Sequence, residues 1–154
     1  MRKDVKILIG LSDRRFLKAV VQILGRVYTV QSGFRIRDFA KKVHSFTPDL
    51  VIIDYQFSGM KATDLYQGIE FMHPNCVFVV RAESERLKIA RLLWKRRAMD
   101  YIRKSPRVFD FVQDVNKVVR YIIERKENEE HILQIKALKK SISELKMKLR
   151  KATS

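Results

Sequence analysis

The stretch that decides the fold is PDLVIIDYQFSGM, Pro48 to Met60. Its apolar run, Leu50 to Ile53, ends abruptly on the carboxylate of Asp54, and a loop with a serine and a glycine follows. A continuous Val/Ile/Leu run of this kind is typical of a strand that is covered on both faces of a parallel sheet. The stretch therefore predicts a buried strand that carries one carboxylate at its C-terminal end.

Apolar runs and helical patterns alternate along the rest of the chain. Four more strands are predicted, at Val5–Leu11, Val27–Val30, Val77–Val80 and Tyr101–Ile102. Apolar residues at helical spacing follow each strand, at Phe16–Ile23, Phe34–Phe46, Leu65–Met72, Leu87–Trp94 and from Val108 onward. Five strand–helix units predict an α/β domain with a doubly wound parallel sheet. Ligands of such sheets bind at the carboxyl ends of the strands, which is where Asp54 is expected.

The composition limits the class of protein. A chain of 154 residues that is 46% hydrophobic suits one domain with an appendage. Its lone cysteine, Cys76, lies in an apolar run and predicts a core residue rather than a disulfide scaffold. We expect a cytoplasmic protein, because no apolar run is long enough for a signal peptide or a membrane span. We expect no enzymatic activity, because neither a glycine-rich phosphate loop nor a nucleophile–base pair is visible.

The charge of the chain is strongly positive. Lys and Arg number 33 against 17 acids, a net charge of +16, and the run from Arg81 to Arg107 holds ten bases against three acids. Such a surface should attract acidic protein faces or nucleic acid. Nucleic acid is the second choice of partner, after a protein, because the sequence shows no basic stripe with aromatic residues between the bases. Any such binding should be non-specific and dependent on salt.

The C-terminal part predicts a long helix. No Gly or Pro occurs from Arg120 to Leu149. An Ile/Leu seam repeats at alternating spacings of three and four: Ile135, Leu138, Ile142, Leu145 and Leu149. This seam favours a coiled coil, either with a second copy or with a partner helix. Lysines beside the seam weaken a parallel homodimer and favour an acidic partner. The alternative is an amphipathic helix that folds back onto its own domain.

Four segments resemble the receiver domain of bacterial response regulators, the fold shared with the chemotaxis regulators. They are KILIGLSD, PDLVIIDYQFSGM, VVRA and MDYIRKSP, and they occur in the expected strand–helix order. The resemblance covers residues 1–125 and leaves residues 126–154 as a helical extension. It implies a flavodoxin-like strand order of 2-1-3-4-5 and signalling through protein contacts, with a sensor kinase as one partner.

The resemblance also implies a phosphorylation site. Asp54 stands at the phosphoacceptor position, Lys104 at that of the lysine that pairs with the phosphate, and Tyr101 at that of the switch aromatic. Asp13, Asp54 and the backbone carbonyl of Gln56 would hold Mg²⁺. Phosphoryl transfer to a carboxylate needs such an anionic nucleophile and a divalent cation beside it.

Two positions depart from the receiver pattern. Ser12 stands where the family has a second acid, which should weaken Mg²⁺ binding. Arg81 stands where the family has a Thr or Ser that bonds the phosphate. The guanidinium either pairs with Asp54 and replaces both metal and phosphate, or points outward and leaves the site open. Three functions remain: a phosphorylated receiver, a pseudo-receiver adaptor, and a non-specific nucleic-acid-binding protein.

Overall fold

The computed structural model describes residues 2–62, 64–65, 68, 75–83 and 99–153. The chain forms two compact units, Met1–Val119 and Arg120–Ser154. The predicted helix at Leu87–Trp94 and most of the one at Leu65–Met72 lie outside the described residues, as does most of the basic run that follows Arg81.

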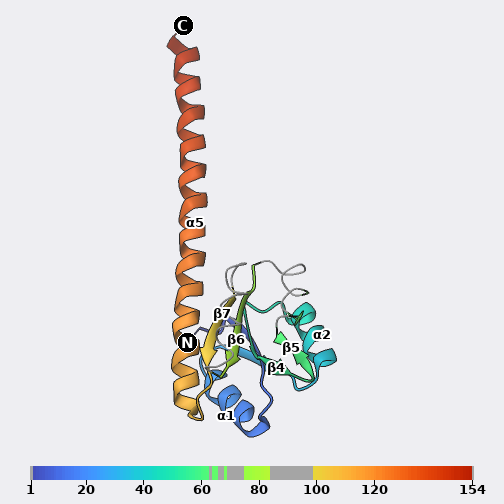
Figure 1. Cartoon of the computed structure of the whole chain (residues 1–154). Coiled ribbons are helices and arrows are strands. Elements are labelled where there is room, and N and C mark those ends of the chain that lie inside the picture. The colour runs from blue at the N-terminus through green and yellow to red at the C-terminus, as the bar shows by residue number, and fades with distance from the viewer. Residues whose placement is uncertain (1, 63, 66–67, 69–74, 84–98, 154) are drawn as a thin grey trace. The chain divides into compact units, whose positions relative to one another are not determined.

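A five-stranded parallel sheet forms the centre of the first unit (Figure 1). Its strands are β1 (Lys6–Gly10), β2 (Thr29–Ser32), β3 (Leu50–Asp54), β6 (Val77–Ala82) and β7 (Met99–Arg103). They lie in the order β2-β1-β3-β6-β7, and each neighbouring pair is parallel. With the small hairpin β4–β5 left out, this is the predicted order 2-1-3-4-5. The predicted fold class is therefore confirmed.

The hairpin was not predicted, because the sequence indicated only a loop after β3. Two short antiparallel strands, β4 (Gln56–Phe57) and β5 (Met60–Lys61), form it. Its turn residues Ser58 and Gly59 have φ of 53° and 78°, the left-handed region that tight hairpin turns require. The Ser58 hydroxyl accepts a hydrogen bond of 3.2 Å from the backbone N–H of Ile36, which ties the hairpin to the start of the next helix.

Three helices are described: α1 (Arg14–Leu24), α2 (Ile36–Phe46) and α5 (Val108–Thr153). The buried residues of α1 are Phe16, Leu17, Val20 and Leu24, whereas Ile23, which the predicted stripe contained, is 41% exposed. Phe34 was also predicted in a helical stripe. It lies before α2 and is 44% exposed, so that part of the prediction is wrong.

The central strands β1, β3 and β6 are buried on both faces, which explains their continuous apolar runs. On one face, alternate strand residues such as Val51, Ile53 and Val80 form a cluster with Phe39 of α2. On the other face lie α1 and the first turns of α5, whose rings Phe16 and Phe111 meet edge to face at 5.7 Å. Figure 1 shows α2 and the start of α5 on opposite sides of the sheet. Cys76 is buried, as predicted.

The second unit consists of the continuation of α5, a helix of 46 residues in all. Every residue from 126 to 153 is exposed. Each of the five seam residues from Ile135 to Leu149 has at least 50% of its surface exposed. Within the described chain, no helix combines the length and the apolar character that crossing a membrane requires.

Candidate functional site

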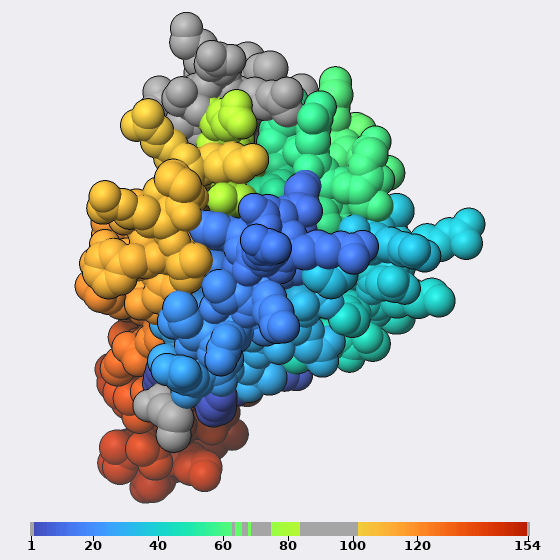
Figure 2. All heavy atoms as spheres, turned by 90° about the horizontal axis from the view of Figure 1, so that it is seen from below, coloured from blue at the N-terminus to red at the C-terminus, as the bar shows by residue number. Residues whose placement is uncertain are grey.

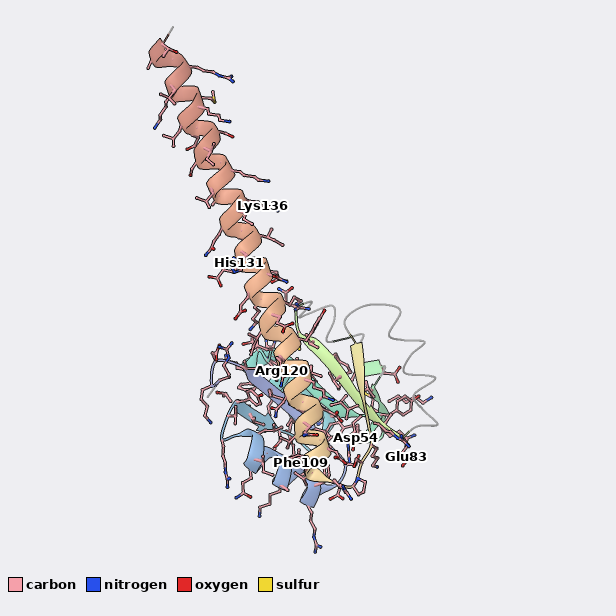
Figure 3. All side chains as sticks on the ribbon, turned by 90° about the vertical axis from the view of Figure 1, so that its left-hand side faces the viewer. Asp54, Glu83, Phe109, Arg120, His131 and Lys136 are labelled. Carbon is pink, nitrogen blue, oxygen red and sulfur yellow. The ribbon has the colours of Figure 1, made fainter. Side chains whose placement is uncertain are left out.

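The candidate site lies at the carboxyl ends of β3 and β6. Asp54 and Arg81 are register partners on these two adjacent parallel strands. Since Val51, Ile53 and Val80 face the α2 side of the sheet, strand alternation places Asp54 and Arg81 together on the opposite face. Figure 3 shows Asp54 and Glu83 at this end of the sheet. The fold alone therefore brings the carboxylate and the guanidinium together.

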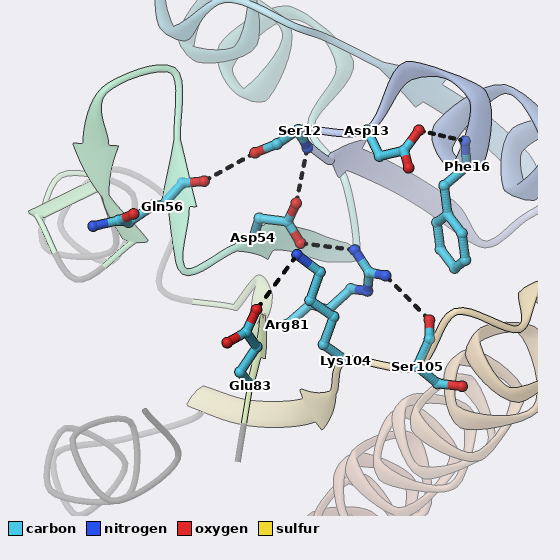
Figure 4. A network of polar contacts seen from close by, with 9 residues as sticks. All are labelled: Ser12, Asp13, Phe16, Asp54, Gln56, Arg81, Glu83, Lys104 and Ser105. Carbon is cyan, nitrogen blue, oxygen red and sulfur yellow. Dashed lines mark hydrogen bonds and ion pairs between the residues drawn. The ribbon is translucent and has the colours of Figure 1, made fainter. Parts of the chain in front are cut away.

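The Arg81 side chain points at Asp54. Its Nη1 lies 3.1 Å from Asp54 Oδ1, and the two side chains are only 4% and 7% exposed (Figure 4). Its Nη2 donates a hydrogen bond of 3.3 Å to the carbonyl of Ser105. The guanidinium lies over the Phe16 ring, 4.3 Å from its centroid, with the centroid of Phe111 at 5.8 Å. Two aromatic rings and two oxygen acceptors thus hold the cation in one position.

Ser12 forms a hydrogen bond with the second carboxylate oxygen of Asp54. Its backbone N–H donates a hydrogen bond of 2.8 Å to Asp54 Oδ2. Its hydroxyl donates one of 3.0 Å to the carbonyl of Gln56. The serine that replaces the expected acid therefore links the end of β1 to both β3 and β4. Both oxygens of Asp54 and the Gln56 carbonyl are engaged by groups of the chain itself.

Asp13 has a local structural role. Its Oδ1 accepts a hydrogen bond of 3.1 Å from the backbone N–H of Phe16, and its backbone is extended, so it is the N-cap of α1. Aspartate is among the preferred N-cap residues because its carboxylate satisfies a backbone donor that the helix leaves unpaired. The carboxylate expected to bind metal is therefore used at the start of the helix.

Lys104 lies at the rim of the site. Its backbone N–H donates to the carbonyl of Ala82 at 2.8 Å, which fixes its position after β7. Its Nζ lies 4.0 Å from Glu83, in a pair whose side chains are 46% and 66% exposed. Ion pairs this exposed contribute little to stability. Tyr101 lies on β7 opposite Val80, and its side chain is outside the described part of the structure.

A cavity of about 220 Å³ opens at this end of the sheet. Its lining residues are Ser12, Asp54, Tyr55, Gln56, Arg81, Ala82, Glu83 and Lys104. The structure therefore brings four of the predicted site residues together. Asp13 is not among the described residues that line the cavity.

The donor set of this cavity does not fit Mg²⁺. Magnesium is bound in proteins by one or two carboxylates and further oxygens in a near-octahedral shell. Two carboxylates line the cavity, but Asp54 is paired with Arg81 at 3.1 Å and Glu83 with Lys104 at 4.0 Å. Among the described residues, no group of three His, Cys, Asp or Glu side chains is arranged to hold a metal ion.

Several residues of the site were not found from the sequence. The two rings around Arg81 and the carbonyl of Ser105 carried no local signal, because they come from α1, from α5 and from the segment before α5. At Ser12 the sequence indicated only that the expected acid is missing. Its two hydrogen bonds depend on how closely β1, β3 and β4 end together.

Neither a family model nor a curated protein sequence matches the chain. Solved structures do. A response regulator receiver domain protein from Clostridium thermocellum is 21% identical, with a TM-score of 0.68 over 80% of this chain and 97% of that one. NtrX from Brucella abortus is 18% identical, with a TM-score of 0.72 over 81% of this chain, which spans 29% of the NtrX chain.

A third structure belongs to a family of redox sensors in the streptococci described as evolved from two-component response regulators. It is 17% identical, with a TM-score of 0.70 over 82% of this chain and 55% of that one. These similarities show that the chain has the receiver-domain fold.

Proposed function

We propose that this protein is a pseudo-receiver, a signalling protein of receiver fold that acts through protein contacts without phosphorylation of Asp54. The observation that carries the proposal is the buried ion pair between Arg81 and Asp54. In this reading the guanidinium supplies permanently the positive charge that a metal ion would supply in a phosphorylated site. The chain would then be fixed in one state and would carry no enzymatic activity of its own.

The environment of Asp54 argues against a phosphoacceptor. A nucleophilic carboxylate must present a free oxygen to the incoming phosphorus, yet one oxygen of Asp54 pairs with Arg81 and the other accepts the Ser12 N–H. Removing one partner of a buried ion pair costs several kcal/mol, because the other charge is left uncompensated. An incoming phosphoryl group would have to meet that cost without a metal ion beside it.

Intact-mass spectrometry tests the proposal. The full chain is incubated with acetyl phosphate and Mg²⁺ under conditions that label an ordinary receiver, which serves as the positive control. We expect no added phosphoryl mass. A phosphoryl adduct on the native chain that is absent from Asp54→Asn would overturn the proposal. Arg81→Thr is a useful second variant, because any labelling that appears there would identify Arg81 as the block.

The exposed seam of α5 supports a second part of the proposal, that this helix recruits a partner helix. Residues 131–154 carry seven bases and one acid. A parallel pair of identical helices would align these bases with each other, whereas an acidic helix would complement them. We propose that the partner presents an acidic amphipathic helix.

A binding assay separates the two kinds of pairing. A labelled heptad peptide with Leu at its a and d positions and Glu at its flanking positions should bind the full chain. A peptide with Lys at the flanking positions should not. Equal binding of the two peptides would contradict an acidic partner. So would a dimeric mass of the full chain in light scattering if neither peptide binds.

A further inference from the structure

We propose that the receiver unit carries a second site, separate from Asp54, that binds a nucleoside polyphosphate between α1 and α2. A cavity of about 520 Å³ lies there, within the size range of small-molecule sites. Its lining residues are Arg14, Ser32, Gly33, Phe34, Arg35, Asp38, Lys41 and Lys42. None of these residues lines the cavity beside Asp54. Figure 2 shows α1, in blue, beside the lighter blue segment that leads into α2.

The charge of this pocket favours an anion. Four cationic side chains line it against the single carboxylate of Asp38. Arg35 and Lys41 are both exposed, and neither forms an ion pair within the described part of the chain. Lys42 Nζ donates to the carbonyl of Ser32, which holds that ammonium group at the pocket wall. Like charges gathered in a concave site concentrate anions there, and a polyphosphate offers several negative charges in a small volume.

Phe34 adds a surface for a flat ring. It is 44% exposed, and the guanidinium carbon of Arg14 lies 5.0 Å from its ring centroid. An exposed aromatic ring among bases is the arrangement on which nucleic-acid bases stack. The sequence did not predict it, because Phe34 was assigned to a helix and its basic neighbours come from two separate helices.

The cationic side chains and the exposed ring together favour one class of ligand. Inorganic phosphate would use the cations and leave the ring exposed, and an uncharged nucleoside would use the ring and leave the cations uncompensated. A nucleoside di- or triphosphate uses both. The cavity has room for one such molecule, whereas a longer nucleic acid would have to extend beyond it.

Calorimetric titration of the full chain at low and physiological salt tests the site, with ATP, pyrophosphate and adenosine as probes. We expect ATP to bind at least tenfold more tightly than either other probe. Phe34→Ala should weaken ATP binding several-fold and leave pyrophosphate binding unchanged. The double variant Arg35→Gln, Lys41→Gln should weaken ATP and pyrophosphate binding by tenfold or more.

Lys139→Gln with Arg150→Gln is the matched control, because it removes the same two kinds of charge from the exposed part of α5. It should leave ATP binding within twofold of the native value, and circular dichroism should show that each variant remains folded. No ATP binding to the full chain, or equal losses in the pocket and control variants, would overturn the proposal. So would a single-stranded oligonucleotide that displaces ATP at equal phosphate concentration. The phosphodonor experiment on Asp54 is independent of all these outcomes.

Discussion

Asp54 and Arg81 are opposite each other on adjacent parallel strands, and their side chains form a buried ion pair of 3.1 Å. The relationship follows from the register of β3 and β6 together with strand alternation. The neighbouring strand thus supplies the cation that pairs with the strand-end carboxylate.

The ion pair should dominate the effect of substitutions at this site. Replacing Arg81 by Met keeps the apolar volume between the Phe16 and Phe111 rings and leaves Asp54 buried without its partner. We expect the free energy of unfolding to fall by ~3–5 kcal/mol, because an uncompensated buried charge is costly. Urea denaturation at neutral pH measures this change.

A double-mutant cycle provides the control for that prediction. Adding Asp54→Asn to Arg81→Met should recover part of the lost stability, since the unpaired charge is then removed. If the two substitutions changed the free energy of unfolding additively, the two residues would not be coupled.

Gly10 is predicted to tolerate no side chain. A Cβ added there would lie 2.8 Å from Phe39 Cε2 and 3.0 Å from Phe57 Cζ. Gly10→Ala should therefore destabilise the chain by ~1–3 kcal/mol, as overpacking of a core does. Gly68→Ala is the matched control, because its added Cβ would meet no described atom within 4 Å. Thermal unfolding of both variants makes the comparison, and equal melting temperatures would show that the core adapts.

Asp13 is predicted to act as a helix cap and not as a metal ligand. Asp13→Ala should lower the stability by ~0.5–2 kcal/mol, because the Phe16 N–H loses its acceptor. Asp13→Asn should retain most of the stability, since asparagine also caps helices. Added Mg²⁺ should leave the melting temperature of the native chain unchanged. If Mg²⁺ instead raised the melting temperature of the native chain but not that of either variant, Asp13 would be assigned to a metal site.

Asp114 predicts a pH dependence of stability. Burial raises the pKa of its carboxyl, the positive charge of Lys117 lowers it, and Asp110 adds to the rise. Because the folded chain then holds the proton more tightly than the unfolded chain, the contribution of this group to stability grows as the pH falls through the raised pKa. Asp114→Asn should therefore be at least as stable as the native chain near neutral pH. That advantage should shrink toward pH 3, and an advantage that grew on acidification would contradict the assigned direction.

The sheet could be predicted from the sequence because burial on both faces leaves continuous apolar runs, and Leu50–Asp54 is the clearest of them. The β4–β5 hairpin could not, since two-residue strands have no periodicity to detect. The buried face of α1 was predicted only in part, because Ile23 fits the helical spacing from Phe16 and Val20 as well as Leu24 does. The folded chain buries Leu24 and leaves Ile23 exposed, which the spacing alone does not encode.

The residues of the candidate site were predictable one by one but their contacts were not. The sequence allowed two orientations of the Arg81 side chain. The orientation depends on the β3–β6 register and on Phe16 and Phe111, which come from helices far apart in the sequence. The hydrogen bonds of Ser12 likewise depend on how β1, β3 and β4 end together, and the role of Asp13 depends on where α1 begins.

NMR of the arginine side chains shows whether Arg81 is fixed against Asp54. In the native chain at low temperature, the Arg81 guanidinium should show separate, slowly exchanging Nη–H signals, because it is buried and hydrogen-bonded to Asp54 and Ser105. Asp54→Asn should shift these signals or accelerate their exchange. Averaged Arg81 signals like those of exposed arginines, unchanged by Asp54→Asn, would contradict the claim.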